Sequence, residues 1–231
     1  KDILQKFNLE KMDELENLKH LVFENLSIKD SFFINILELD TLELINCKYE
    51  YTTEFRLLEF GRELKKLHIS CIHCDENILR ILSPTKISNS ILTIQNLTHL
   101  NLSGIETVIG VSIEENSLPK LEELILNNIN FTTESNFLTS INNISNINFL
   151  SLEGCKLDLF PNIFELNNLK KLYLSNNNLE IVPDDIEILK KLEYLELNNN
   201  KISSLTEKIC DLRAVSYTHL RAHETDSYLV C

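Results

Sequence analysis

Pairs of large apolar residues separated by a single position recur along most of the chain. Successive pairs begin 21, 25, 33, 24, 26, 22 and 23 residues apart, so the repeating units differ in length. Alternate residues of an extended segment point to the same face, so each pair predicts a short strand with both side chains in a common core. The pairs are Leu21/Phe23, Leu42/Leu44, Leu67/Ile69, Leu100/Leu102, Leu124/Leu126, Leu150/Leu152, Leu172/Leu174 and Leu195/Leu197.

Each predicted strand is followed by a polar turn and an apolar return segment. In the C-terminal units an Asn or Cys stands three residues after the second leucine, as Asn177 does after Leu174. An Asn side chain bonds to backbone groups and predicts a turn there. Residues 183–189 then have apolar positions three apart, which is typical of a short helix or 3₁₀ turn. No single unit buries its own apolar face, so the units must stack with their strands parallel and side by side.

The repetition is clearest in residues 147–212, where Leu172, Leu174 and Asn177 recur 23 residues later. This pattern resembles the leucine-rich repeat, whose core is L-x-x-L-x-L-x-x-N/C-x-L. The resemblance implies an α/β fold: a curved solenoid, or horseshoe, with a parallel β-sheet on the concave face. Short helices, 3₁₀ turns and loops would cover the convex face. Two prolines in the return segments are similar to those of the intracellular type of repeat, namely Pro161 and Pro183.

Residues 1–214 are expected to form one leucine-rich repeat domain of about eight irregular units. The unit at 67–99 is enlarged, which predicts a convex segment or protruding loop, with a helix around 75–82. In four units an apolar residue replaces the Asn or Cys of the slot: Leu26, Ile72, Ile105 and Ile129.

Composition narrows the class of protein. The chain has 231 residues, of which 43% are hydrophobic, and a formal net charge of −13. No apolar run approaches the ~18 residues that a membrane-spanning helix requires. The acidic balance argues against binding nucleic acid, which needs a basic face, and it favours a basic partner surface.

The last residues differ in composition from the rest. Both alanines, Ala214 and Ala222, occur there, whereas Asn is absent after Asn200. The segment 215–231 resembles a translated sequencing adapter and is interpreted as a non-native tail; the alternative is a divergent final repeat. Because the chain begins with Lys1 rather than Met and shows no recognisable cap, we expect it to be a fragment.

The sequence has six cysteines. Cys47 and Cys155 occupy the Asn/Cys slot, where a small buried thiol is expected. The remaining pattern fits a reducing compartment better than an oxidising one, so a cytoplasmic location is favoured over secretion. A His-x-x-Cys-x-His-Cys cluster offers zinc-like ligands, but ordinary residues at a strand exit explain it better, and we expect no metal or cofactor. Its members are His68, Cys71, His73 and Cys74.

Residues between and beside the leucine pairs are expected to face the concave surface. Three aromatic side chains there fall on adjacent predicted strands and are flanked by charged residues, a composition typical of protein-binding hot spots. The alternative is that a surface of this size carries a few aromatics by chance. The expected partner-binding residues are Phe149, Ser151, Glu153, Lys171, Tyr173, Tyr194 and Glu196.

No phosphate-binding loop, paired catalytic carboxylates or nucleophile motif is recognisable, so the chain is not expected to be an enzyme. The favoured hypothesis is a non-catalytic module that binds a protein or peptide on its concave face. Resemblance to the intracellular repeats implies signalling scaffolds or substrate receptors. One alternative is the targeting region of a larger enzyme, such as a kinase or ubiquitin ligase. Another is a secreted or surface adhesin of internalin-like type.

Overall fold

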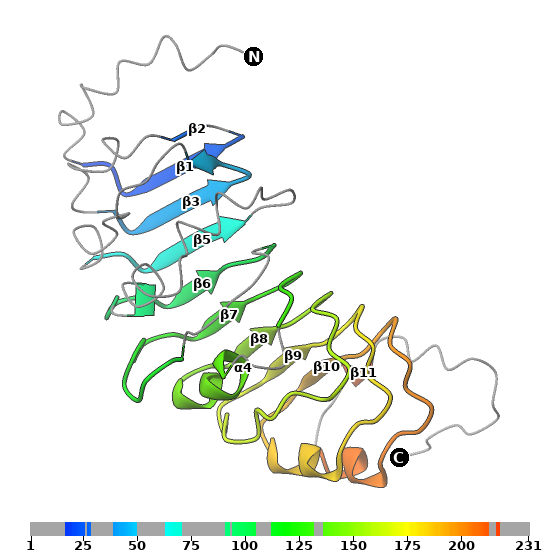
Figure 1. Ribbon diagram of the computed structural model, residues 1–231. Coiled ribbons are helices and arrows are strands. Elements are labelled where there is room, and N and C mark those ends of the chain that lie inside the picture. The colour runs from blue at the N-terminus through cyan, green and yellow to red at the C-terminus, as the bar shows by residue number, and fades with distance from the viewer. Residues whose placement is uncertain are drawn as a thin grey trace.

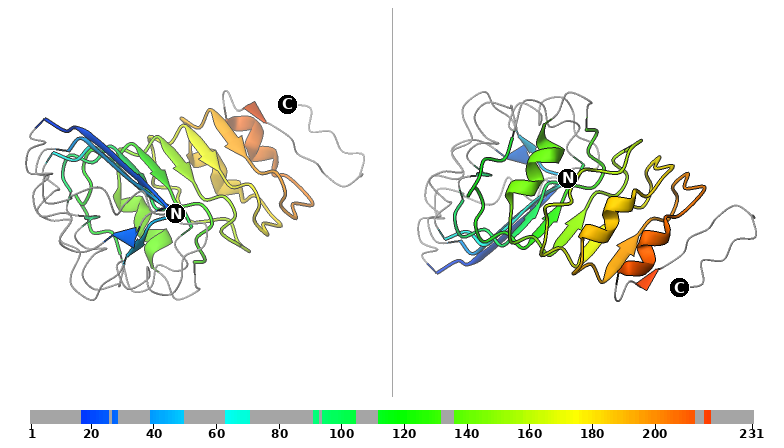
Figure 2. Two further views of the ribbon diagram at one scale, coloured as in Figure 1. Left: turned by 90° about the horizontal axis from the view of Figure 1, so that it is seen from above. Right: turned by 90° about the horizontal axis from the view of Figure 1, so that it is seen from below.

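The computed structural model describes residues 17–25, 27–28, 39–49, 63–70, 91–92, 94–104, 112–131, 136–212 and 216–217. Figure 1 shows the strands side by side in one curved sheet, with helical turns along the opposite side of the array. The views in Figure 2 show that the units follow one another from one end of the array to the other. The expected solenoid with a parallel sheet is therefore confirmed.

Within the residues that the structure describes, the main sheet has nine strands, all parallel, and each pairs with the strand of the next unit. In order they are β1 (His20–Glu24), β3 (Thr41–Ile45), β5 (Lys66–Ser70), β6 (His99–Asn101), β7 (Glu123–Ile125), β8 (Phe149–Ser151), β9 (Lys171–Tyr173), β10 (Tyr194–Glu196) and β11 (Ser216–Tyr217). A second, two-stranded parallel sheet pairs β2 (Ser27–Ile28) with β4 (Lys48–Tyr49).

The leucine pairs set the register of the sheet. Leu150 on β8 is opposite Leu172 on β9, which is opposite Leu195 on β10. The same alignment continues back to Leu21 on β1, so all eight predicted strands occur at the predicted positions. The burial pattern alternates along these strands because the leucines face the core and their neighbours face outward.

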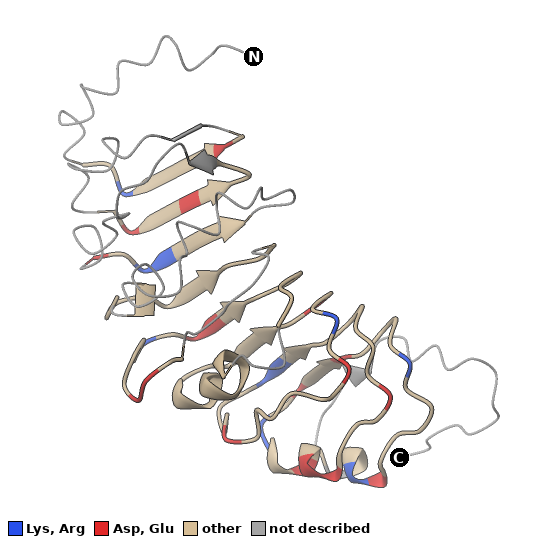
Figure 3. Cartoon of the chain, in the orientation of Figure 1, with Lys and Arg blue, Asp and Glu red and all other residues tan. Residues whose placement is uncertain are grey.

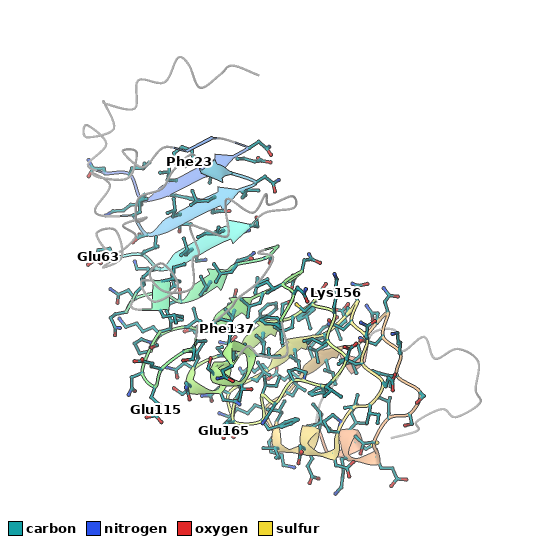
Figure 4. The ribbon with its side chains drawn as sticks, in the orientation of Figure 1. Phe23, Glu63, Glu115, Phe137, Lys156 and Glu165 are labelled. Atoms are coloured by element: carbon teal, nitrogen blue, oxygen red, sulfur yellow. The ribbon has the colours of Figure 1, made fainter. Side chains whose placement is uncertain are left out.

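The return segments close the core from the convex side. They contain α4 (Phe137–Ser140), η4 (Ile141–Asn143), η5 (Asp184–Ile188) and η6 (Glu207–Asp211), where η denotes a 3₁₀ helix. In Figure 4, Phe137 lies among the core side chains, whereas Glu115 and Glu165 point away from the array. The predicted turn at 183–189 is confirmed, because η5 begins directly after Pro183 and buries Ile186.

A left-handed residue ends the strand in seven units, and it is always Asn or Gly. It stands one position before the Asn/Cys slot, as Gly154 does before Cys155 and Asn176 before Asn177. Such residues tolerate positive φ better than others do. The turn is therefore made by the residue preceding the slot. The seven are Asn25, Asn46, Gly104, Asn128, Gly154, Asn176 and Asn199, with φ between 51° and 76°.

The slot residue has a separate task, which is to bond backbone groups of neighbouring units. The Asn177 amide donates to the carbonyls of Leu152 (2.8 Å) and Leu174 (2.9 Å) and accepts from the Leu157 N–H (3.0 Å). Cys155 occupies the same slot one unit earlier, and its thiol donates to the carbonyl of Leu126 at 3.1 Å. These bonds stabilise the stacking of one unit on the next.

Some predictions fall partly or wholly outside the described residues. The helix expected around 75–82 lies outside them, as do three of the four apolar slot residues; the fourth, Ile129, is fully buried. At the C-terminal end, β11 continues the sheet two residues beyond the expected boundary at 214. There Leu195 is opposite Tyr217, a tyrosine at a leucine position. The non-native tail at 215–231 stays a prediction.

Candidate binding surface on the concave sheet

The expected partner-binding residues come together on β8, β9 and β10 and just beyond them; we call these seven residues the concave patch. Phe149, Lys171 and Tyr194 form one row across the three strands. Ser151, Tyr173 and Glu196 form the next row, two residues further along each strand. Glu153 follows β8 at the third position on the same face.

The three aromatic rings of the concave patch contact one another in a zigzag across the strands. The ring centroids of Phe149 and Tyr173 are 5.1 Å apart with an interplanar angle of 39°. Those of Tyr173 and Tyr194 are 5.0 Å apart at 32°. Tilted pairs at this spacing are favourable by about 0.5–1.5 kcal/mol each. The rings therefore hold one another in place on the surface before any partner arrives.

Glu196 is positioned by three neutral donors. Its carboxylate accepts hydrogen bonds from the Tyr194 hydroxyl (3.2 Å), the Ser175 hydroxyl (3.1 Å) and the Asn198 amide (2.6 Å). Ser175 is fully buried, so it supports the carboxylate from beneath. The result is a carboxylate of fixed orientation beside the ring of Tyr194.

Asn127, on the turn after β7 (Glu123–Ile125), organises the other acidic residue of the patch. Its side-chain oxygen accepts from the Ser151 hydroxyl (2.6 Å) and from the backbone N–H of Glu153 (3.0 Å). Ser151 is only 2% exposed, so it supports its neighbours from beneath and offers almost no contact area to a partner. Sequence reasoning did not single out Asn127, Ser175 or Asn198, although all three are short polar residues at the position after the second leucine.

The electrostatic environment of the concave patch is negative. The pKa of Glu153 is raised, chiefly by burial and then by the negative charge of Glu196. The pKa of Tyr173 is also raised, first by burial and then by Tyr194 and both carboxylates. Among the described residues, no Lys, Arg or His lies within ion-pair distance of Glu153 or Glu196.

The N-terminal half of the concave face has a different chemistry, with histidines beside carboxylates. Glu43 on β3 bonds to His20 at 2.9 Å and to His68 at 3.4 Å, bridging three adjacent strands. His99 and Glu123 form a similar pair at 3.4 Å. The pKa of Glu43 is lowered, mainly by its hydrogen bond with His20.

The cysteines divide into two kinds. Cys47 and Cys155 are buried thiols outside any disulfide, and burial raises the pKa of Cys155 to about 12. Cys210 is disulfide-bonded. Cys71, His73 and Cys74 lie outside the described residues, and within those residues no group of three or more His, Cys, Asp or Glu side chains is placed to hold a metal.

Among the described residues, no helix combines the length and apolar character needed to cross a membrane.

Sequence comparison matches residues 167–210 to the family described as "Leucine Rich repeats (2 copies)". This range contains β9, η5 and β10, the most regular part of the array.

Curated relatives are similar over different parts of the chain. The volume-regulated anion channel subunit LRRC8D of Homo sapiens is 33% identical over 94 residues, covering 39% of this chain and 11% of that protein. Subunit LRRC8B of Homo sapiens is 28% identical over 206 residues, covering 86% and 24%. Adenylate cyclase of Schizosaccharomyces pombe is 23% identical over 214 residues, covering 86% and 12%. The chain thus spans between about a tenth and a quarter of the length of these relatives.

Two solved structures share the fold. An internalin C2 from Listeria monocytogenes aligns with a TM-score of 0.60 and 16% identity over 92% of this chain and 84% of that one. A chain of the Toll–Spatzle complex of Drosophila aligns with a TM-score of 0.63 and 16% identity, covering 81% and 24%. The repeated leucines, the match over residues 167–210 and the parallel-stranded solenoid agree that this chain has the leucine-rich repeat fold, with leucine-rich repeats matched by the family model in residues 167–210.

Proposed function

We propose that the chain is a non-catalytic module that binds a protein or peptide partner on the concave patch. The observation that carries the proposal is the zigzag of contacting rings that Phe149, Tyr173 and Tyr194 form across three adjacent strands. The leucine-rich repeat fold supports a protein-interaction role in general, because its stacked strands provide an extended concave surface. Catalysis is not part of the proposal, since the solenoid is typically a non-catalytic fold.

The contacts among the three aromatic rings support binding at the concave patch. Aromatic side chains bring a large contact area with few rotatable bonds, which is why they dominate binding hot spots. Here Tyr173 contacts a ring on either side, so less side-chain freedom is left to lose when a partner binds. Lys171 lies between Phe149 and Tyr194 in one row, and Glu153 and Glu196 lie on the two strands beside Tyr173 or directly after them. The patch therefore combines aromatic contact area with charged groups at neighbouring positions.

A second candidate is that the array targets a larger enzyme to its substrate. The similarity to the adenylate cyclase of Schizosaccharomyces pombe favours it, because 86% of this chain aligns with 12% of that protein. Under this candidate the concave patch still binds a protein, and any catalysis belongs to another region. The disulfide at Cys210 favours the alternative that the chain is a secreted or surface adhesin. A cytoplasmic location stays a prediction.

A displayed peptide library tests the proposed function. Peptides selected on the wild-type chain should bind it and should lose at least tenfold in affinity for the variant Tyr173→Ala/Tyr194→Ala. The control variant Leu159→Ala/Ile181→Ala removes two exposed apolar side chains, 82% and 64% exposed, away from the patch, and should bind normally. Circular dichroism melts must show that both variants fold. Peptides that bind the tyrosine variant unchanged would place the binding surface elsewhere and defeat the proposal.

A further inference from the structure

The concave patch has a chemical direction along its strands. Lys171 precedes Tyr173 by two residues, at the N-terminal end of β9. Glu153 follows β8, and Glu196 lies on β10, so the two acidic residues are on either side of the central strand β9. Figure 3 shows basic and acidic residues both present on the C-terminal strands of the sheet. Lys171 thus lies one row before Tyr173, whereas Glu196 lies in the same row as Tyr173 and Glu153 one row beyond it.

The part of the concave patch around Glu153 and Glu196, which we call its negative end, is rich in hydrogen-bond acceptors. Glu196 accepts hydrogen bonds from three neutral groups. Glu153 and Glu196 are both partly buried, and no cation of the described residues forms an ion pair with either. Asn198 adds the side-chain oxygen Oδ1, which is buried and has no hydrogen-bond partner among the residues described. Partly buried carboxylates without a counter-charge are poorly solvated, so a cation supplied by a partner is favoured there.

The three aromatic rings of the concave patch provide a second attraction for the same cation. Ring faces attract a guanidinium or ammonium group, and arginine is the commoner partner because its flat group stacks on the ring. A guanidinium also has five N–H donors, enough to reach two carboxylates at once, whereas an ammonium acts as a point charge. Lys171 repels a second cation at the opposite end of the patch, so the incoming charge is directed toward Glu153 and Glu196.

From this charge complementarity we propose that the concave patch recognises an arginine side chain of a protein or peptide partner, with its guanidinium against the three contacting aromatic rings, between Glu153 and Glu196. The inference rests on the proposed function and adds the chemistry of the partner. The net charge of −13 acts in the same direction, because it attracts basic surfaces from a distance.

Small-molecule probes test the arginine site directly. The chain has six tyrosines, so ring-labelled tyrosine gives few NMR signals, which the variants Tyr173→Phe and Tyr194→Phe assign. Titration with N-acetyl-arginine amide should shift the Tyr173 signal in a saturable way. N-acetyl-citrulline amide, which has the same shape without the charge, should bind at least tenfold more weakly. Equal shifts with both probes, or no saturable shift with the arginine probe, would overturn the inference.

The variant Glu153→Gln/Glu196→Gln provides the protein side of the test. It should lower affinity for the arginine probe at least tenfold, while leaving the citrulline probe unaffected. The control Glu165→Gln/Glu180→Gln changes two exposed carboxylates outside the patch and should have no effect. If library peptides require Tyr173 and Tyr194 but bind the Glu153→Gln/Glu196→Gln variant equally well, the arginine inference fails and the proposed function stands. If no peptide requires the tyrosines, the proposed function itself fails.

Discussion

The side-chain amide of Asn177 donates a 2.8 Å hydrogen bond to the backbone carbonyl of Leu152 in the preceding repeat unit. The same amide bonds to Leu174 in its own unit, and its oxygen accepts from the Leu157 N–H. One buried side chain therefore satisfies backbone groups of two neighbouring units. In a solenoid, where each unit contacts only its neighbours, bonds of this kind determine whether the units unfold together or separately.

Replacing Asn177 by Ala should lower the free energy of unfolding by about 2–4 kcal/mol, because it leaves buried backbone groups without partners. Urea denaturation followed by circular dichroism measures the loss. Asn167→Ala is the matched control, since its exposed amide bonds only to the nearby Glu165 carbonyl. Asn177→Cys should retain part of the stability, because Cys155 occupies the same slot one unit earlier. An Asn177→Ala variant as stable as the control would show that the slot contributes little.

Gly154→Ala should destabilise the chain for two reasons. Gly154 has φ of +67°, and a Cβ atom there would collide with the Asn128 side chain of the neighbouring unit. The conformational part alone costs about 1–2 kcal/mol. Asn176→Ala tests that part at the corresponding position, where φ is 60°, with the added loss of only one exposed hydrogen bond from Asn199. Thermal melts should rank Gly154→Ala below Asn176→Ala, and the reverse order would contradict the predicted collision.

Glu153→Gln should stabilise the free protein at neutral pH. The pKa of Glu153 is raised in the folded chain, so its ionised form is disfavoured by burial and by the charge of Glu196. The folded state therefore gains stability below the ordinary pKa of a glutamate and loses it as the pH rises through the raised value. Urea midpoints of the variant and the wild type should differ at pH 7 and converge near pH 4. A variant less stable than the wild type at pH 7 would contradict this assignment.

Glu43→Gln should have the opposite effect. The pKa of Glu43 is lowered, first by the hydrogen bond with His20, so the folded state favours the carboxylate. Its contribution is present above the ordinary glutamate pKa and is lost as the pH falls through the lowered value. The variant should be less stable than the wild type near pH 5.5 and equal to it near pH 3. A constant difference across this range would mean that packing, not charge, explains the effect.

Much of the fold could be predicted from the sequence. Each leucine pair marks a strand, and the register of the parallel sheet follows because Leu150, Leu172 and Leu195 must all enter one core. The position of the left-handed turn was harder to predict. Asn occupies both the turn position and the slot, as Asn176 and Asn177 do, so residue type alone does not separate the two tasks.

The candidate site could be predicted in outline only. Alternation along the strands placed Phe149, Tyr173 and Tyr194 on one face, but it did not show that their rings touch. It also treated Ser151 as a surface residue, whereas a hydrogen bond to Asn127 accompanies its burial beneath the surface. Contacts of this kind depend on side-chain directions across three strands, and no single unit encodes them.

By itself, the sequence determined which residues form strands and which side of each strand enters the core. Apolar residues at every second position of a strand share one face, and only the burial of that face removes them from water. Only the tertiary structure decided what the outward side chains do. The Tyr173–Tyr194 contact and the effect of Glu196 on the pKa of Glu153 join residues of different units. Ring contacts and charge interactions act over a few ångströms in space, and stacking of the units brings these side chains within that range.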